Sequence, residues 1–366
     1  MSPAKVYFSD FRMKNGQNHG TKLRKLMQAA GMDQIDFEGK YVAIKIHFGE
    51  LGNLAFLRPN FARYVADYVK ELGGRPFLTD CNTLYVGSRK NALDHLDTAN
   101  INGFNPMSTG CQILIGDGLK GTDDVEVPVE GGVYCKTAKI GRAIMDADIV
   151  ISLNHFKGHE CTGFGGALKN LGMGCGSRAG KMEMHSAGKP YVGDGCIGCK
   201  ACARVCAHDG PQFDENGKAS IDHDKCVGCG RCIGVCPMDA VKPAHDESFD
   251  ILNAKIAEYS KAVVDGRPCF HINIVNNVSP NCDCHEENDA AIVNDVGMFA
   301  SFDPVAIDVA CADAVNKQPV NPLSILRLRA NADHFGSLHS TTNWRVATEH
   351  AEQLGIGVQD YELITV

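Results

Sequence analysis

The feature that most constrains this chain is a duplicated run of cysteines between residues 196 and 237. The spacing C-x2-C-x2-C-x3-C occurs twice, and each cysteine recurs 30 positions later. The first run is Cys196, Cys199, Cys202 and Cys206, and the second is Cys226, Cys229, Cys232 and Cys236. Self-similarity at a fixed period indicates an internal duplication. Three closely spaced thiolates can hold one face of an iron–sulfur cube, so each site needs a fourth ligand from elsewhere.

In the bacterial two-cluster pattern, the fourth cysteine of each run ligates the other cluster. The spacing therefore predicts two [4Fe–4S] clusters. One would be held by Cys196, Cys199, Cys202 and Cys236, and the other by Cys226, Cys229, Cys232 and Cys206. A structural zinc site is the alternative, but zinc typically uses two separated C-x2-C pairs or a mixture of cysteine and histidine.

The same stretch resembles bacterial ferredoxins over about fifty residues. The resemblance implies a small ferredoxin domain with two [4Fe–4S] clusters. Pro237 keeps the proline that follows the last cysteine of that pattern, whereas Ala207 replaces it after the first run.

Composition limits the remaining possibilities. The chain has 366 residues, which is too many for a ferredoxin alone, and its net charge is −8 without a basic block. We therefore expect no nucleic-acid partner, because phosphates require clustered lysine and arginine. No apolar run is long enough for a membrane span, and residues 1–10 lack a signal-peptide pattern. With 17 cysteines, eight of them at cluster spacing, we expect a reducing cytoplasm rather than disulfides.

Short β-rich runs alternate with helical patterns on both sides of the cysteine-rich stretch. The strands are expected at 6–9, 41–48, 76–78, 112–115, 149–153, 270–275 and 363–366, and the helices at 21–30, 59–72, 138–145, 249–263, 305–315 and 344–354. This alternation predicts an α/β fold with a mostly parallel sheet. We interpret residues 1–187 and 244–366 as one host domain and 188–243 as an inserted ferredoxin domain. A host domain followed by a separate C-terminal domain is the alternative.

Polar side chains follow two of these strands directly. His47 comes after the strand at 41–46, and His155, Lys157 and His159 come after the strand at 149–153, with Lys169 ten residues further on. Because ligands in parallel α/β sheets bind beyond the carboxyl ends of strands, these five residues are the predicted catalytic groups. The glycines at 163–166 do not form a G-x-G-x-x-G pattern and no Walker A pattern is present, so a nucleotide site there has little support.

Cys282, Cys284 and His285 follow the strand at 270–275. Thiolates with an adjacent imidazole can bind a soft or borderline metal, so an additional metal ion is one interpretation. A reduced loop whose thiols only pack is the other. Asp303, before Pro304, is expected to cap a helix rather than to act in catalysis.

Three segments, 45–50, 154–170 and 281–285, resemble the uncharacterised Fe–S centre proteins known as domain of unknown function 362. That resemblance covers nearly the whole chain and implies no particular reaction. The spacing of His159, Lys169 and His185 is also similar to that of nickel-pincer lactate racemases. This second resemblance implies His159 as the acid–base group, Lys169 as the cofactor anchor and His185 as a metal ligand. The chain departs from it with Gly165 in place of serine.

Three functions follow. The first is an oxidoreductase in which two clusters relay electrons to a small-molecule substrate or a cofactor in the host domain, with histidines moving protons. The second is an electron carrier or cluster-handling protein whose partner is an electron donor or acceptor protein. The third is a metal-dependent isomerase with accessory clusters.

Overall fold

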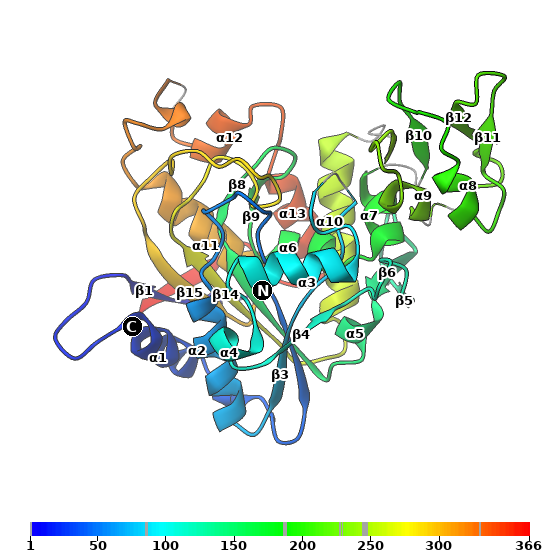
Figure 1. Ribbon diagram of the computed structural model, residues 1–366. Coiled ribbons are helices and arrows are strands. Elements are labelled where there is room, and N and C mark those ends of the chain that lie inside the picture. Colours follow the sequence, from blue (N-terminus) through cyan, green and yellow to red (C-terminus); the bar gives the residue numbers. More distant parts are fainter. Residues whose placement is uncertain are drawn as a thin grey trace.

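A large central sheet organises the protein (Figure 1). The computed structural model describes residues 2–84, 87–185, 189–226, 228, 230–243, 248–328 and 331–366. In spatial order the strands of the sheet are β16 (Tyr361–Thr365), β1 (Ala4–Asp10), β15 (Gly297–Ser301), β14 (Cys269–Val275), β7 (Ile149–His155), β2 (Tyr41–Lys45), β3 (Arg75–Asp80) and β4 (Gln112–Ile115). β15 runs antiparallel to β1 and β14, and every other neighbouring pair is parallel. The predicted α/β class with a mostly parallel sheet is confirmed.

Helices cover both faces of the sheet. The helices α1 (His19–Ala29), α2 (Pro59–Glu71) and α3 (Ala92–Ile101) cover one face, and α6 (Ala167–Cys175), α10 (Phe249–Val264) and α11 (Pro304–Asn316) cover the other. In β2, Val42 and Ile44 pack with the first group, whereas Ala43 packs on the side of α6 and α10. Burial on both faces explains why these strands are continuous apolar runs.

Shorter elements complete the fold. The remaining helices are α4 (Pro106–Thr109), α5 (Arg142–Met145), α7 (Arg178–His185), α8 (Ala201–Val205), α9 (Arg231–Gly234), α12 (His334–Leu338) and α13 (Arg345–Gln353), with 3-10 turns at Met32–Gln34 and Ile325–Leu328. Two small hairpins join β5 (Asp124–Pro128) to β6 (Thr137–Gly141) and β8 (Lys157–His159) to β9 (Gly163–Gly165). No helix among the described residues combines the length and apolarity that crossing a membrane requires.

The cysteine-rich segment lies beyond α7, at one end of the molecule (Figure 1). It has its own small sheets, β10 (Pro190–Val192) with β13 (Val241–Pro243) and β11 (Pro211–Phe213) with β12 (Ala219–Ile221). Pro190 pairs with Pro243, so the chain enters and leaves this segment side by side. The host fold resumes directly afterwards with α10, which packs against α6.

One expected helix is wrong in its first half. Residues 138–145 were expected to be helical, but Thr137–Gly141 forms strand β6 and only Arg142–Met145 is helix α5. Ala138 and Ile140 are buried while Thr137 and Lys139 are only half-buried, so the segment has the two-residue period of a strand paired with β5. The expected cap is confirmed, because Asp303 accepts hydrogen bonds from the backbone of Val305 and Ala306 at 2.9 and 2.8 Å.

Asp308 fixes the start of α6 against α11. Its carboxylate accepts the backbone N–H groups of Ala167 at 2.7 Å and Leu168 at 2.9 Å, and Asn273 donates to it at 2.8 Å. A side chain at position 166 would collide with this carboxylate, so glycine is needed there. Since α6 carries Lys169, this contact positions part of the site described below.

We expect Asp308→Ala to lower the free energy of unfolding by about 3 kcal/mol, because it leaves buried N–H donors without an acceptor. Denaturant unfolding measures the difference. Glu349→Ala, at an exposed position of α13, is the matched control and should change stability little. Equal stabilities of the two variants would contradict this role for Asp308.

Candidate functional site

A cavity of about 260 Å³ lies beyond the carboxyl ends of the neighbouring strands β14, β7, β2 and β3. Most of the host-domain residues that the sequence singled out line it, namely His47, His155, Lys157, His159, Lys169, His185, Cys284 and His285. Cys282 is fully buried beside them. The expected location at strand ends therefore brings these residues together, because the carboxyl ends of parallel strands meet at one edge of the sheet.

Cys282 and Lys169 form a charged pair. Lys169 Nζ lies 3.5 Å from Cys282 Sγ. A hydrogen bond from Cys284, together with the positive charges of Lys157 and Lys169, holds the pKa of Cys282 well below its usual range despite its burial. The same hydrogen bond, in which Cys284 is the donor, raises the pKa of Cys284. The two thiols therefore share one proton, with the negative charge on Cys282.

His159 faces the same thiols with a fixed tautomer. Its Nδ1 accepts the backbone N–H groups of Cys161 at 3.1 Å and Thr162 at 3.3 Å. A neutral imidazole has one acceptor and one donor nitrogen, so its proton lies on Nε2. His159 is consequently arranged to donate a hydrogen bond.

His155 has a different environment. Its Nδ1 lies 2.9 Å from an oxygen of Asp283, and its Nε2 lies 2.8 Å from the carbonyl oxygen of Asn276. Both ring nitrogens face acceptors, and only the doubly protonated imidazolium satisfies both. Burial would raise the pKa of Asp283, but the charges of His155 and Lys157 hold it below its usual range. The pair anchors the loop that carries Cys282 and Cys284.

Three overlapping groups of side chains could hold a metal ion, with ligand atoms within 4.8 Å of one another. They are His159 with Cys282 and Cys284, His159 with Glu160 and Cys161, and Glu160 with Cys284 and His285. His185, the fourth residue of the predicted metal set, lines the cavity but belongs to none of these groups among the described residues. His285 Nε2 lies 2.8 Å from Glu160, and this hydrogen bond raises the pKa of His285.

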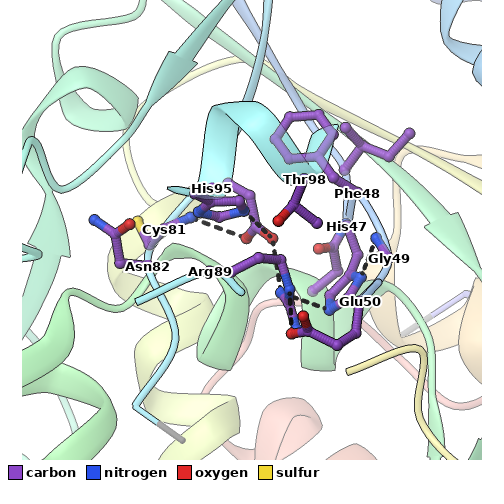
Figure 2. Close-up of polar contacts among 12 residues, drawn as sticks. His47, Phe48, Gly49, Glu50, Cys81, Asn82, Arg89, His95 and Thr98 are labelled. Carbon is purple, nitrogen blue, oxygen red and sulfur yellow. Dashed lines mark hydrogen bonds and ion pairs between the residues drawn. The ribbon is translucent and has the colours of Figure 1, made fainter. Parts of the chain in front are cut away.

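Arg89 also lines the cavity, and Figure 2 shows its polar contacts with Glu50 and His47. It is 1 % exposed, and its guanidinium lies 3.1 Å from both Glu50 Oε2 and His47 Nε2. Burial, and then the charge of Arg89, lowers the pKa of His47 well below its usual range, so His47 is neutral. No sequence pattern points to Arg89, which lies within a turn.

A buried ion pair lies at the base of the cavity. Lys45 Nζ is 2.9 Å from Asp80 Oδ1 and donates to Asn170 Oδ1 at 2.6 Å. The sequence analysis assigned no role to Lys45 or Asp80. A lysine within an otherwise apolar buried strand was the available signal, because lysine is almost never fully buried without a partner.

In the cysteine-rich segment, Cys196, Cys199, Cys202 and Cys236 line a second, small cavity. These are the four residues that the sequence assigned to one cluster. Backbone N–H groups point at the sulfurs, from Ala219 to Cys196 at 3.3 Å, from Ala240 to Cys236 at 3.3 Å and from Gly210 to Cys206 at 3.4 Å. Such bonds stabilise thiolate ligands and tune iron–sulfur centres, so this donor set fits the predicted cluster.

The second set of cysteines is described only in part. Gly210 lies between Cys206 and Cys226, which brings the fourth cysteine of the first run close to the second run. Cys232 packs nearby, at the edge of an apolar cluster. Cys229 lies outside the described residues.

That apolar cluster joins the cysteine-rich segment to the main cavity. It consists of Leu84, Met182, Cys202, Ile233 and Val241, with Cys236 also packed against it. Leu84 also lines the main cavity, as does His185 at the end of α7, the helix that carries Met182. An ion pair between Lys90 and Asp239 adds a polar contact across the same boundary.

Fold and site together define an α/β protein with a polar cavity at its strand ends and a cysteine-rich segment packed beside it. The family model described as "Domain of unknown function (DUF362)" matches residues 42–313, and the chain belongs to this family. No curated protein matches it significantly.

Two solved structures show distant likeness. One is the lactate racemase apoprotein from Thermoanaerobacterium thermosaccharolyticum, with a TM-score of 0.40 and 10% identity over 75% of this chain and 51% of that one. The other is a structural-genomics protein from Thermotoga maritima, with a TM-score of 0.33 and 10% identity over 93% of this chain and 61% of that one. The chain thus spans less than two thirds of either protein.

The Cys282–Lys169 pair predicts a distinctive pH dependence of thiol modification at Cys282. In the wild type, Cys282 stays ionised as the pH falls below the ordinary range of a thiol, so its reaction with methyl methanethiolsulfonate should persist there. Lys169→Met removes one positive charge and should slow this reaction about tenfold or more at pH 6.5, because one pKa unit is a tenfold change in thiolate.

Tandem mass spectrometry of the peptide containing residues 281–285 measures the modification at Cys282. Lys317→Met, at an exposed position after α11, is the control and should behave as the wild type. Superimposable pH profiles for Lys169→Met and the wild type would refute the charged pair.

Proposed function

We propose that this protein is an iron–sulfur oxidoreductase. In this proposal residues 188–243 form a ferredoxin domain with two [4Fe–4S] clusters, and the substrate or a second cofactor occupies the main cavity. When bound, the clusters would supply electrons one at a time.

The observation that carries the proposal is the position of Leu84. This one side chain packs in the apolar cluster that contains Cys202, and it also lines the main cavity. Cys202 and Cys236, both assigned to the first iron–sulfur cluster, pack in or against the same apolar cluster, which reaches the wall of the cavity through Leu84. If the cysteine-rich segment were only a structural support, it would not need to share the wall at Leu84 with the main cavity.

The side chains of the cavity suit a reduction. His159 presents an N–H at Nε2 and can donate a proton or a hydrogen bond to a reacting group. Lys169 can stabilise negative charge that develops beside it. His47 accepts the Gly49 N–H at Nδ1 and faces Arg89 at Nε2, and His155 is likewise engaged on both nitrogens, so both serve to hold the walls of the cavity in place.

The proposal implies an electron donor or acceptor protein as a partner and a cytoplasmic location. An additional metal ion at Glu160, Cys284 and His285 is compatible with it, because these three side chains offer converging oxygen, sulfur and nitrogen ligands.

Anaerobic metal and sulfide analysis tests the proposal. The protein should contain about eight irons and about eight sulfides per chain. Cys236→Ser should lose about four of each, because that residue is assigned to the first cluster. Cys269→Ser is the control, since Cys269 is a half-buried cysteine at the start of β14, and it should keep the full content. Zinc in place of iron would refute the proposal.

Reoxidation of the dithionite-reduced protein then distinguishes among the remaining functions. Reoxidation by a small-molecule acceptor, slowed in His159→Gln, is the result that an oxidoreductase gives. Reoxidation only by another protein would instead support the electron carrier, and isomerisation that continues with the clusters oxidised would support the isomerase.

A further inference from the structure

Lys157 is a buried lysine whose ammonium group hydrogen-bonds to no described residue. It is 5 % exposed and lines the main cavity. Among the described residues, no hydrogen bond or ion pair to its ammonium group is present. Gly165 makes room for the group, because a side chain there would collide with Nζ. Burying a charge without a partner is costly, so a protein that keeps one normally has a ligand for it.

Each negative group near Lys157 already has a partner of its own. The Cys282 thiolate pairs with Lys169 at 3.5 Å, and Asp283 pairs with His155 at 2.9 Å. Asp308 accepts two backbone N–H groups of α6. The charge of Lys157 acts on all three of these groups, but none of them accepts a hydrogen bond from its ammonium group.

Most of the other charged side chains of the cavity have hydrogen-bond or ion-pair partners. Its described lining contains the cations Lys45, Arg89, Lys157, Lys169 and Lys181 but only the carboxylates Asp80, Glu160 and Asp283. Asp80 pairs with Lys45, and Glu160 with His285. Lys181 hydrogen-bonds to a backbone carbonyl, that of Gly176. Arg89 pairs with Glu50, and Lys169 lies beside the Cys282 thiolate, so Lys157 is the lining cation that lacks a hydrogen-bond acceptor among the described residues.

Lys157 and His159 lie on the same face of strand β8, two residues apart. One offers an ammonium group and the other an imidazole N–H, since Nδ1 of His159 already accepts two backbone N–H groups. Two donors of this kind, close to each other on one strand, match the oxygens of a single oxoanion.

We infer that the main cavity binds a small oxoanion, of which a carboxylate is the best match, with Lys157 and His159 as the donors that hold it. This deepens the proposed function by giving the chemical class of the substrate, and its role as a substrate rests on that proposal. The binding itself does not depend on the clusters. The small volume of about 260 Å³ limits the ligand to a short acid.

Isothermal titration calorimetry of the intact protein at constant ionic strength tests the inference, with oxalate, pyruvate and inorganic phosphate as the probes. At least one probe should bind at millimolar concentrations. Lys157→Met should weaken that binding about tenfold or more, because a charge-assisted hydrogen bond is lost. Lys317→Met is the control and should bind as the wild type does.

Thermal unfolding of the same proteins provides a second measurement. Without added anion, Lys157→Met should melt above the wild type, because an unpaired buried charge has been removed. A merely structural lysine would give a lower melting temperature. The anion should raise the melting temperature of the wild type more than that of the variant.

The three probes distinguish the possible ligands. The outcomes also distinguish the inferred anion site from the proposed iron–sulfur oxidoreductase function. Binding of oxalate or pyruvate alone identifies a carboxylate site, and binding of phosphate alone identifies a site for phosphate. Failure of all three probes, or equal binding to wild type and Lys157→Met, would overturn the inference. Anion binding to a protein without iron–sulfur clusters would leave the inference intact and remove only the proposed function.

Discussion

The buried ion pair between His155 and Asp283 is the contact on which the site depends. His155 ends β7, and Asp283 lies in the loop after the neighbouring strand β14. The pair holds that loop at the edge of the sheet. Because Cys282 and Cys284 flank Asp283 in the chain, they lie on either side of this contact. Because both nitrogens of His155 are engaged, the imidazolium has little freedom to move. The thiols therefore face Lys169 and His159 in one defined arrangement.

This arrangement balances charge within a closed space. A thiolate, three carboxylates and five cationic side chains lie in or beside one cavity, where low polarity strengthens every interaction. Most of these charges are paired, and the pairing makes their burial tolerable. Lys157 stands apart because its ammonium group makes no hydrogen bond among the described residues, which is why we infer an anionic ligand.

The role proposed for the cysteine-rich segment depends on where this segment packs against the host domain. It could have extended from the host domain through its two connections alone, since β10 and β13 bring these side by side. Instead, α9 packs against α7, with Gly230 close to Arg178 and Met182. The elements that carry this contact, α7 and the segment around Leu84, are also walls of the cavity. A redox role for the segment is proposed on this basis.

Much of this could be predicted from the sequence, for physical reasons that differ between the parts. The parallel sheet follows from buried, mostly apolar strands such as β7, and the site follows because polar residues stand where these strands end. The segment 138–145 was mistaken for one helix because its apolar residues satisfy a helical period as well as a strand period. Arg89 could not be predicted, because its contacts with Glu50 and His47 depend on tertiary packing across about forty residues of chain. The tautomer of His159 likewise depends on hydrogen bonds that no spacing reveals.

The most direct test of the account is an EPR-monitored redox titration of the wild type and of Lys181→Met. Lys181 lines the cavity and lies next to Met182, which packs with Cys202. If iron–sulfur centres occupy the segment and the first lies against the cavity, loss of this positive charge should lower the potential of that centre more than that of the other. Equal potentials in the two proteins, or no iron–sulfur signal in either, would contradict the claim that the clusters adjoin the cavity.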